Sequence, residues 1–188
     1  MKQLVLGLTA FYILRVEKER MRKMTELNVL IEATKQSEGE LISVWFELPI
    51  DEDEFFEKLG VSVDSTDYKI IEKQLPFPDD VGEDTTVERL NELYELFRDL
   101  PMDIQEECST FLDYYSSLDE LHHHRYDMIH YAGCKNMEDV ARHILSESPE
   151  FQSLSEQCIR YFDFEAYGEY LNDNGNFLET EQGIYELA

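Results

Sequence analysis

The feature that most constrains this chain is the even spread of negative charge along a sequence that still has the composition of a folded protein. The 188 residues include 42 acidic and 16 basic side chains, which gives a formal net charge of −26. The first 36 residues have a net charge of +3, so positions 37–188 carry −29. An acidic disordered tail has few aromatic residues, whereas this chain is 12% aromatic and 43% hydrophobic. We therefore expect a packed body with carboxylates on its outside.

The cysteines and the N-terminal segment indicate the cellular compartment of the protein. Cys108, Cys134 and Cys158 form no CxxC pair and are odd in number, which favours a reduced, cytoplasmic protein without a disulfide framework. The apolar stretch Leu4–Leu14 is too short to span a membrane and leads into a charged segment, so we expect neither a membrane anchor nor a signal peptide. Residues 1–24 are interpreted as an N-terminal extension distinct from the rest.

Strand patterns dominate the first third of the chain. Leu27–Ala33 and Leu41–Leu48 alternate apolar and polar residues around a turn-like segment, which predicts a β-hairpin, and Tyr68–Glu72 suggests a third strand. Between them, Asp51 and Glu54 have the spacing of a helix N-terminal capping pair, and Gly60 ends that short helix. Residues 74–84 contain prolines and a glycine, which is typical of a boundary loop.

Helical spacing of apolar residues follows, which makes the predicted fold α+β and predominantly helical. Thr85 and Glu88 supply the start signal of the first helix, and Pro101 follows its end. A strand pair is predicted in the tail, around residues 181–183. Four helices are expected: Val87–Leu100; a segment starting at Asp103 in which Ile104, Cys108, Phe111, Leu112 and Tyr115 share a face; a segment capped by Asn136; and Leu154–Leu171.

The first predicted helix carries an unusual stripe of acids. Glu88, Glu92, Glu95 and Asp99 are four, three and four residues apart and share one helix face. Like charges at these spacings destabilise a helix by about 0.2–0.5 kcal/mol per pair. A solvated face of an acidic protein explains one such helix, but acidic clusters recur along the whole chain.

The recurrence allows a DNA-like charge array. Duplex DNA carries one negative charge per about 1.7 Å of its axis, so 29 charges correspond to about 49 Å of duplex. Carboxylates at fixed spacing would offer a DNA-binding protein a field similar to that of phosphates. Composition alone makes DNA mimicry an open hypothesis.

Four local motifs strengthen it. Residues 39–51 (GELISVWFELPID), 88–93 (ERLNEL), 137–141 (MEDVA) and 161–168 (YFDFEAYG) resemble, in this order, the ArdA-type antirestriction proteins. The similarity runs from about Leu27 to Leu187, is looser between Asp103 and Lys135, and is most specific in the last motif. The His-rich segment 121–125 departs from the family pattern, because it interrupts the acidic track.

The resemblance implies a DNA mimic of mobile elements or phages that blocks type I restriction-modification enzymes by occupying their DNA-binding groove. It further implies an elongated rod of three small domains, here residues 25–83, 84–126 and 127–188, that forms a homodimer and binds neither nucleic acid, cofactor, metal nor membrane. The expected partner-binding surface comprises Glu52, Asp53, Glu54, Asp79, Asp80, Glu83, Asp84, Glu88, Glu92, Glu95, Asp99, Glu106, Asp113, Asp119, Glu120, Asp163, Glu165, Glu169 and Asp173.

Other functions stay open at this point. The mimic could act on a CRISPR effector or on a nucleoid or regulatory protein, and a plain acidic scaffold for basic proteins is a further alternative. An enzyme is disfavoured because no catalytic or phosphate-binding motif occurs. Zinc binding by His122–His124, His130 and Cys134 is less favoured than a solvated histidine run. The last helix has more aromatic residues than one buried stripe needs, so Tyr161, Phe164 and Tyr167 are candidates for a subunit or domain contact.

Overall fold

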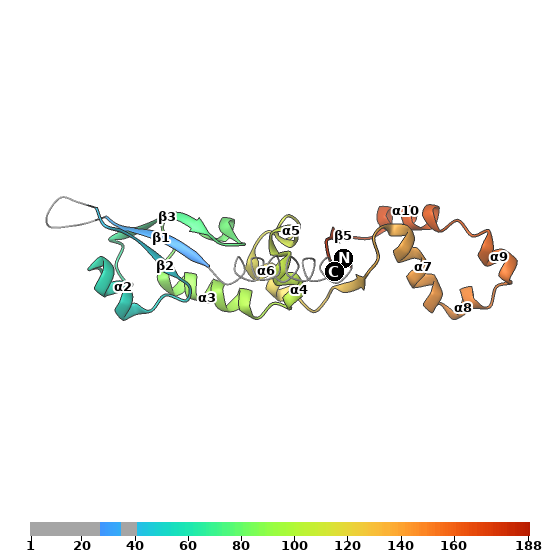
Figure 1. The fold of residues 1–188 in the computed structure, drawn as a ribbon, viewed down its shortest axis with the longest axis horizontal. Helices are drawn as coiled ribbons and strands as arrows, with labels where there is room; N and C mark the ends of the chain where they lie inside the picture. Colours follow the sequence, from blue (N-terminus) through green and yellow to red (C-terminus); the bar gives the residue numbers. More distant parts are fainter. Residues whose placement is uncertain (1–26, 35–40) are drawn as a thin grey trace, which may run out of the picture.

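The protein is an α+β protein in which short elements follow one another along a long axis (Figure 1). The computed structural model describes residues 27–34 and 41–188. The N-terminal extension, residues 1–24, therefore lies outside the described residues. Two three-stranded antiparallel sheets and a series of mostly short helices make up the described part, as the α+β prediction requires. No helix in these two ranges is long and apolar enough to cross a membrane.

The first sheet confirms the predicted hairpin and the third strand. β1 (Asn28–Ala33) lies between β2 (Ser43–Glu47) and β3 (Tyr68–Gln74), antiparallel to both. Alternate residues of β1, among them Val29 and Ile31, are fully buried, as expected for a strand with one face on the core.

The helix after the hairpin forms as predicted from its capping residues. In α2 (Glu52–Leu59) the Asp51 side chain accepts a hydrogen bond from the Glu54 backbone N–H at 2.9 Å. Gly60 ends the helix in the left-handed conformation, with φ of 70°. Phe55 of this helix packs against Phe46 and Tyr68 of the sheet, with ring centroids 5.2 and 5.0 Å away.

The first long helix starts at Val87, as predicted, but its N-cap is Thr86 instead of the predicted Thr85, and it ends two residues earlier, at Arg98. A 3₁₀ turn, η1 (Pro78–Asp80), precedes α3 (Val87–Arg98), whose N-cap is Thr86. The Thr86 hydroxyl accepts from the Arg89 N–H, whereas the Thr85 hydroxyl accepts from Gly82 and stabilises the preceding turn. Thr86 therefore caps the helix, and Thr85 stabilises the turn before it.

The segment after Pro101 is more broken than predicted. A single helix starting at Asp103 is wrong, because the Glu107 backbone leaves the helical region and separates α4 (Met102–Glu106) from α5 (Cys108–Leu112). The expected apolar face is buried at Ile104, Cys108, Phe111 and Tyr115. Ser109 and Thr110 are weak helix formers, so packing rather than propensity decides the path here. An unpredicted helix, α6 (Leu118–His124), follows, capped by the Ser117 hydroxyl.

The C-terminal part combines a second sheet with four helices. The predicted tail hairpin consists of β5 (Phe177–Thr180) and β6 (Gly183–Glu186), and an unpredicted strand, β4 (Ile129–Ala132), completes the order β4-β6-β5. α7 (Met137–Glu147) is capped by Asn136, as predicted.

The long final helix predicted for Leu154–Leu171 is wrong. Two helices occupy this region, because the chain turns at residues 161–163 and the Asp163 side chain caps a new helix by accepting from the Ala166 N–H. They are α9 (Glu156–Arg160) and α10 (Phe164–Asn174), which ends at Gly175. The short α8 (Pro149–Gln152) precedes them.

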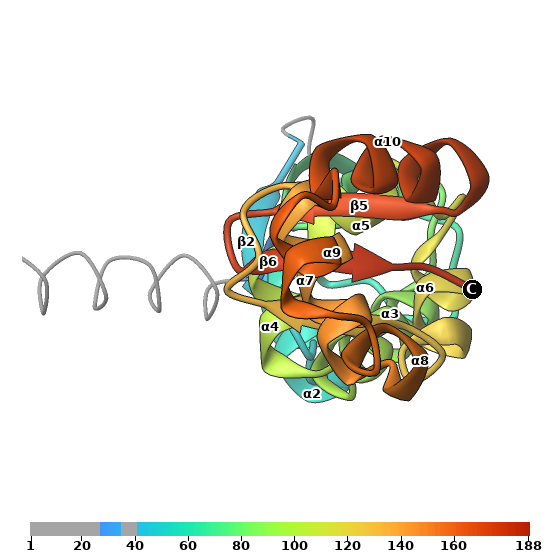
Figure 2. The same ribbon diagram turned by 90° about the vertical axis from the view of Figure 1, so that its right-hand side faces the viewer.

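β6 connects two groups of buried residues. Tyr185 and Leu187 belong to the large core that runs from the first sheet through α3 to α6. Ile184, which directly precedes Tyr185, packs with Tyr131 and Val140 in a smaller core beside α7. Seen along the long axis, β6 and β5 lie behind the helices of the C-terminal part (Figure 2). The strand thus uses both of its faces for packing.

Gly168 allows α10 to cross α7 at short range. A Cβ atom at this position would lie 2.6 Å from the backbone carbon and oxygen of Met137. The close approach places backbone against backbone, where neither side can yield easily.

Gly168→Ala should therefore destabilise the protein by about 1–3 kcal/mol, the usual cost of overpacking. Thermal unfolding followed by circular dichroism measures the change. Asn172→Ala, at an exposed position of the same helix, is the control and should change the melting temperature little. A Gly168→Ala protein with an unchanged or raised melting temperature would show that helix propensity dominates over the contact with Met137.

Candidate partner-binding surface

Most of the predicted surface carboxylates are exposed, and the structure gathers several of them around one groove. Of the predicted set, all but Asp80 and Glu106 are exposed. The groove is open, has a volume of about 1170 Å³ and lies between α2, residues 63–66, α3 and α6. Its lining includes one basic side chain, Arg89. The acidic lining residues, called the groove carboxylates below, are Glu52, Asp64, Glu88, Glu92, Glu95 and Asp119.

Buried polar contacts hold the walls of the groove together. The Asn91 side-chain amide of α3 donates to the Ile50 carbonyl at 2.9 Å, and its oxygen accepts from the Ile50 N–H at 2.7 Å. The Tyr68 hydroxyl accepts from the Val87 N–H at 3.1 Å and donates to the Val63 carbonyl at 3.0 Å. Burial raises the pKa of Tyr68, so the hydroxyl stays protonated as this donor. The carboxylates of α3 are consequently held at a fixed position relative to α2 and residues 63–66.

Arg89 binds the acidic stripe. Its guanidinium donates to Glu92 at 3.0 Å and also to Asp119 of α6. These contacts, the hydrogen bond to Glu92 first, raise the pKa of Arg89. Arg89 therefore bridges two groove carboxylates and joins α3 to α6. Because the pairs are largely exposed, each contributes at most about 1 kcal/mol to stability.

The C-terminal end of the stripe is partly neutralised by the histidine segment. Asp99 lies 2.9 Å from the Arg125 guanidinium and 2.8 Å from His122 Nε2. The hydrogen bond with His122, followed by the charge of Arg125, lowers the pKa of the Asp99 carboxyl. His124 likewise pairs with Asp127, and only His123 of the run is exposed. A fully solvated histidine run is therefore wrong for two of its three members.

Besides Asp163, which caps α10, three further predicted surface carboxylates serve the fold. Asp80 accepts from the Leu118 N–H at 3.0 Å, and burial raises its pKa. Glu106 accepts from the Gln182 side chain, which attaches α4 to the tail hairpin. Glu120 accepts from the side chain and backbone of Ser116, and these bonds lower its pKa. Sequence alone gives no signal for the roles of Asp80 and Glu106, because their partners lie on distant elements, whereas the partner of Glu120 is only four residues away.

Two further sequence predictions concern the groove: Asp64 was not among the predicted surface carboxylates, and zinc binding was considered as an alternative. Asp64 lies in a loop outside the predicted clusters, and only the folded chain places it in the groove. Within residues 27–34 and 41–188, no group of three or more histidine, cysteine, aspartate or glutamate side chains is arranged to hold a metal ion. The described chain thus places no metal-binding group in or beside the groove.

The aromatic residues proposed for a subunit contact differ in their environment. Phe164 lies 4.9 Å from Phe162, and the Arg142 guanidinium sits 4.0 Å above its ring. Tyr167 is half-buried and packs near Phe162, whereas Tyr161 is 78% exposed. Part of the aromatic surplus therefore fills a local cluster of the C-terminal helices, and a subunit contact stays a prediction.

His122→Ala should raise the pKa of the Asp99 carboxyl toward its ordinary value, because the hydrogen bond with His122 is the main cause of the lowering. A ¹³C NMR titration of the carboxyl group measures it. Since the folded pKa is the lower one, the contact contributes fully above the ordinary carboxyl pKa and is lost as the pH falls through the folded value. His123→Ala changes an exposed neighbour and should leave the titration as it is. An unchanged Asp99 titration in His122→Ala would assign the effect to Arg125.

The comparisons with known proteins address the identity of the chain. No curated protein matches it. The family model described as antirestriction protein (ArdA) matches residues 33–186, which includes the groove, the second sheet and α10, and all of the first sheet except residues 28–32. The match covers most of the chain and agrees with the resemblance of the four motifs. The chain belongs to the ArdA family of antirestriction proteins.

Proposed function

We propose that this protein inhibits type I restriction-modification enzymes by occupying their DNA-binding groove with an array of carboxylates. The groove carboxylates are the observation that carries the proposal. Six acidic side chains from four parts of the fold line one open surface with a single arginine. Hydrogen bonds of Asn91 and Tyr68 hold the supporting elements in place. Such preorganised charge attracts a protein surface built to bind phosphates.

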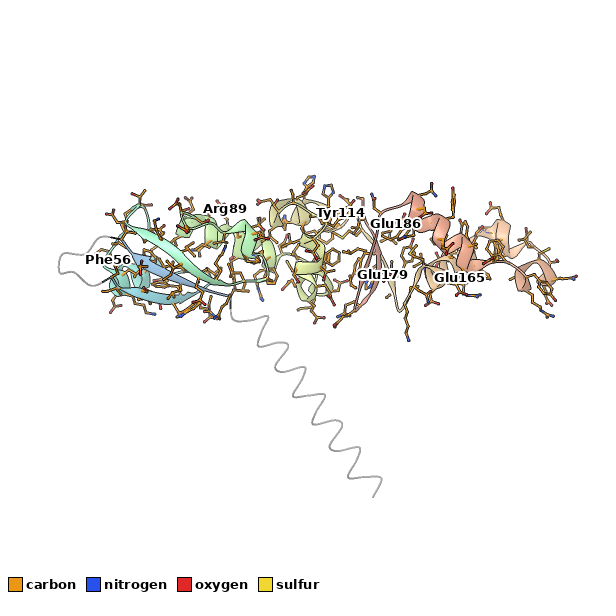
Figure 3. All side chains as sticks on the ribbon, turned by 90° about the horizontal axis from the view of Figure 1, so that it is seen from above. Phe56, Arg89, Tyr114, Glu165, Glu179 and Glu186 are labelled. Atoms are coloured by element: carbon orange, nitrogen blue, oxygen red, sulfur yellow. The ribbon has the colours of Figure 1, made fainter. Side chains whose placement is uncertain are left out.

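The same charge continues beyond the groove. The exposed acids of α10, among them Glu165, lie far along the chain's long axis from Arg89 (Figure 3). Acidic side chains at both places would let one inhibitor contact an extended DNA-binding site. In this proposal the protein acts as a stoichiometric competitor in the cytoplasm, performs no chemistry, and forms an elongated homodimer of three-domain chains.

The primary experiment is displacement of duplex DNA from a purified type I restriction-modification complex, titrated at several salt concentrations. Stoichiometric displacement that weakens with rising salt is expected, since exposed charges are screened over about 10 Å at 0.1 M salt. Salt-independent displacement would contradict an electrostatic mimic. No displacement would overturn the proposed target, and the same titration with a CRISPR effector or a nucleoid protein then tests the alternatives.

A block substitution tests whether the stripe of α3 contacts the enzyme. Glu88→Gln, Glu92→Gln and Glu95→Gln together should weaken inhibition roughly 10- to 100-fold at low salt, if each exposed charge contributes up to about 1 kcal/mol. The control is a triple change at Glu57, Glu156 and Glu179, which are exposed but lie outside the groove. Equal losses in both triples would indicate that total charge alone matters, as in an acidic scaffold.

Removing the positive charge of Arg89 should have the opposite effect on inhibition. Arg89→Gln removes the basic side chain of the groove lining and frees Glu92 and Asp119, so inhibition at low salt should become a few-fold stronger. The dissociation constant of the inhibitor-enzyme complex measures this. Arg98→Gln, on the same helix but outside the groove lining, is the matched control. Weaker inhibition by Arg89→Gln would mean that the ordering of α3 and α6 matters more than their charge.

A further inference from the structure

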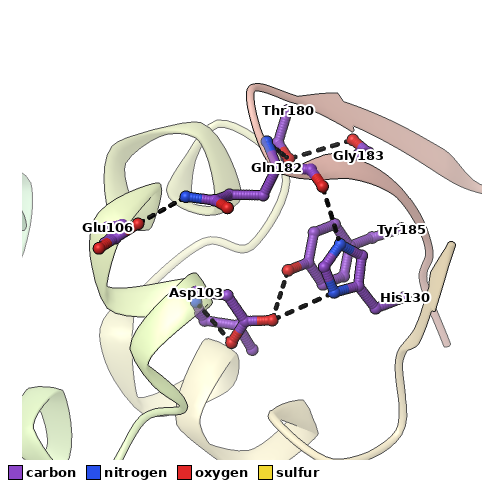
Figure 4. A network of polar contacts seen from close by, with 8 residues as sticks. Asp103, Glu106, His130, Thr180, Gln182, Gly183 and Tyr185 are labelled. Carbon is purple, nitrogen blue, oxygen red and sulfur yellow. Dashed lines mark hydrogen bonds and ion pairs between the residues drawn. The ribbon is translucent and has the colours of Figure 1, made fainter. Parts of the chain in front are cut away.

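A polar network joins the central helices to the C-terminal sheet (Figure 4). The Tyr185 hydroxyl of β6 donates to Asp103 Oδ2 of α4 at 2.6 Å. The same oxygen lies 3.3 Å from His130 Nδ1 of β4. One carboxylate oxygen of α4 thus contacts two neighbouring strands of the sheet. We call Asp103, His130 and Tyr185 the latch.

The two rings of the latch constrain each other. His130 and Tyr185 stack with ring centroids 4.1 Å apart and an interplanar angle of 9°. The other ring nitrogen of His130, Nε2, lies 3.3 Å from the Gln182 carbonyl, and the Gln182 side chain donates to Glu106. Two residues of α4 therefore contact the sheet, one through the latch and one through the β5–β6 turn.

Tyr185 is the buried member of the latch, whereas the His130 and Asp103 side chains are 27% and 36% exposed. Tyr185 is 2% exposed and packs edge-on against Phe111, with ring centroids 4.9 Å apart. At Gly183, where φ is +140°, a Cβ atom would lie 2.7 Å from the Tyr131 carbonyl oxygen and 3.2 Å from His130 Nε2. A buried hydroxyl without its acceptor is costly, so Tyr185 strongly favours the arrangement that keeps Asp103 in reach.

The covalent connection alone does not fix the angle between the central helices and the second sheet. Within the described residues, the chain passes from the central helices to the second sheet once, through residues 125–128. Apolar packing at the junction is non-directional and allows tilting, whereas hydrogen bonds fix distance and angle. The latch supplies the directional contacts.

We propose that the latch sets the angle at which residues 129–188 project from the central helices. Asp103 is then a positioning residue, whose charge is committed to the fold instead of to a partner. The consequence for inhibition rests on the proposed function: a fixed angle keeps the carboxylates of α10 in a constant relation to the groove carboxylates.

Two tyrosine-to-phenylalanine variants of the full chain test the latch. Tyr185→Phe removes the hydroxyl that crosses the junction. Tyr131→Phe removes another buried hydroxyl of the same sheet, one that donates to Glu186 within the sheet. Small-angle X-ray scattering and amide hydrogen exchange report the angle and the local opening. Tyr185→Phe should change the distance distribution and speed exchange in β6 about tenfold, whereas Tyr131→Phe should leave the distribution unchanged.

A second pair of variants tests the latch independently, in case Tyr185→Phe does not fold. Asp103→Asn should reproduce the altered distance distribution, and Glu179→Gln, an equal charge loss at an exposed position of β5, should not. Scattering by Tyr185→Phe and Asp103→Asn that superimposes on that of the parent protein would overturn the proposal. So would an equal change in the controls.

The DNA-displacement titration of the same variants separates the two proposals. Altered scattering together with weakened inhibition supports both the latch and the cooperation of α10 with the groove. Altered scattering without any change in inhibition retains the latch and overturns that cooperation.

Discussion

Mutual repulsion among carboxylates is the constraint to which the rest of this structure responds. A net charge of −26 on 188 residues opposes compaction, and the chain meets it with a continuous apolar core beneath the surface. The core contains large side chains, among them Phe55, Phe97 and Phe111, that are almost fully buried. Packing of this kind does not depend on the charge of the surface carboxylates, so it can hold charges together that would separate by themselves.

The carboxylates divide into two groups according to their contacts. Asp51 and Asp163 cap helices, where a negative charge is favourable. Asp80, Asp103 and Glu106 connect distant elements by accepting hydrogen bonds. The groove carboxylates, in contrast, share one arginine and face an open surface. The many acidic residues therefore serve two purposes: some stabilise the fold, and others create negative potential at the surface. Their contacts in the folded chain show to which group each belongs.

Local sequence signals predicted much of the fold. Capping residues such as Asp51, Gly60 and Asn136 located helix ends correctly, because each acts within one turn. The long helices expected after Asp103 and Leu154 were wrong, since apolar periodicity cannot detect a break at Glu107 or a new cap at Asp163. β4 was missed because four residues are too few to show alternation and its partner lies more than fifty residues away. The stripe on α3 was visible in the sequence, but Asp64 and Asp119 meet it only through tertiary packing, which also brings Asp119 to Arg89.

β6 is the last element to be synthesised, yet its Tyr185 belongs to the core of the central helices. Its Tyr185 pairs with Asp103 across 82 positions of sequence, a separation that takes roughly 4–16 s to translate at 5–20 residues per second. During that interval Phe111 lacks the ring that covers it in the finished core. The central helices thus emerge as an incomplete unit with apolar surface exposed, and closure of a long chain loop is the step that completes them. That delay is the interval in which the emerging chain depends most on chaperones.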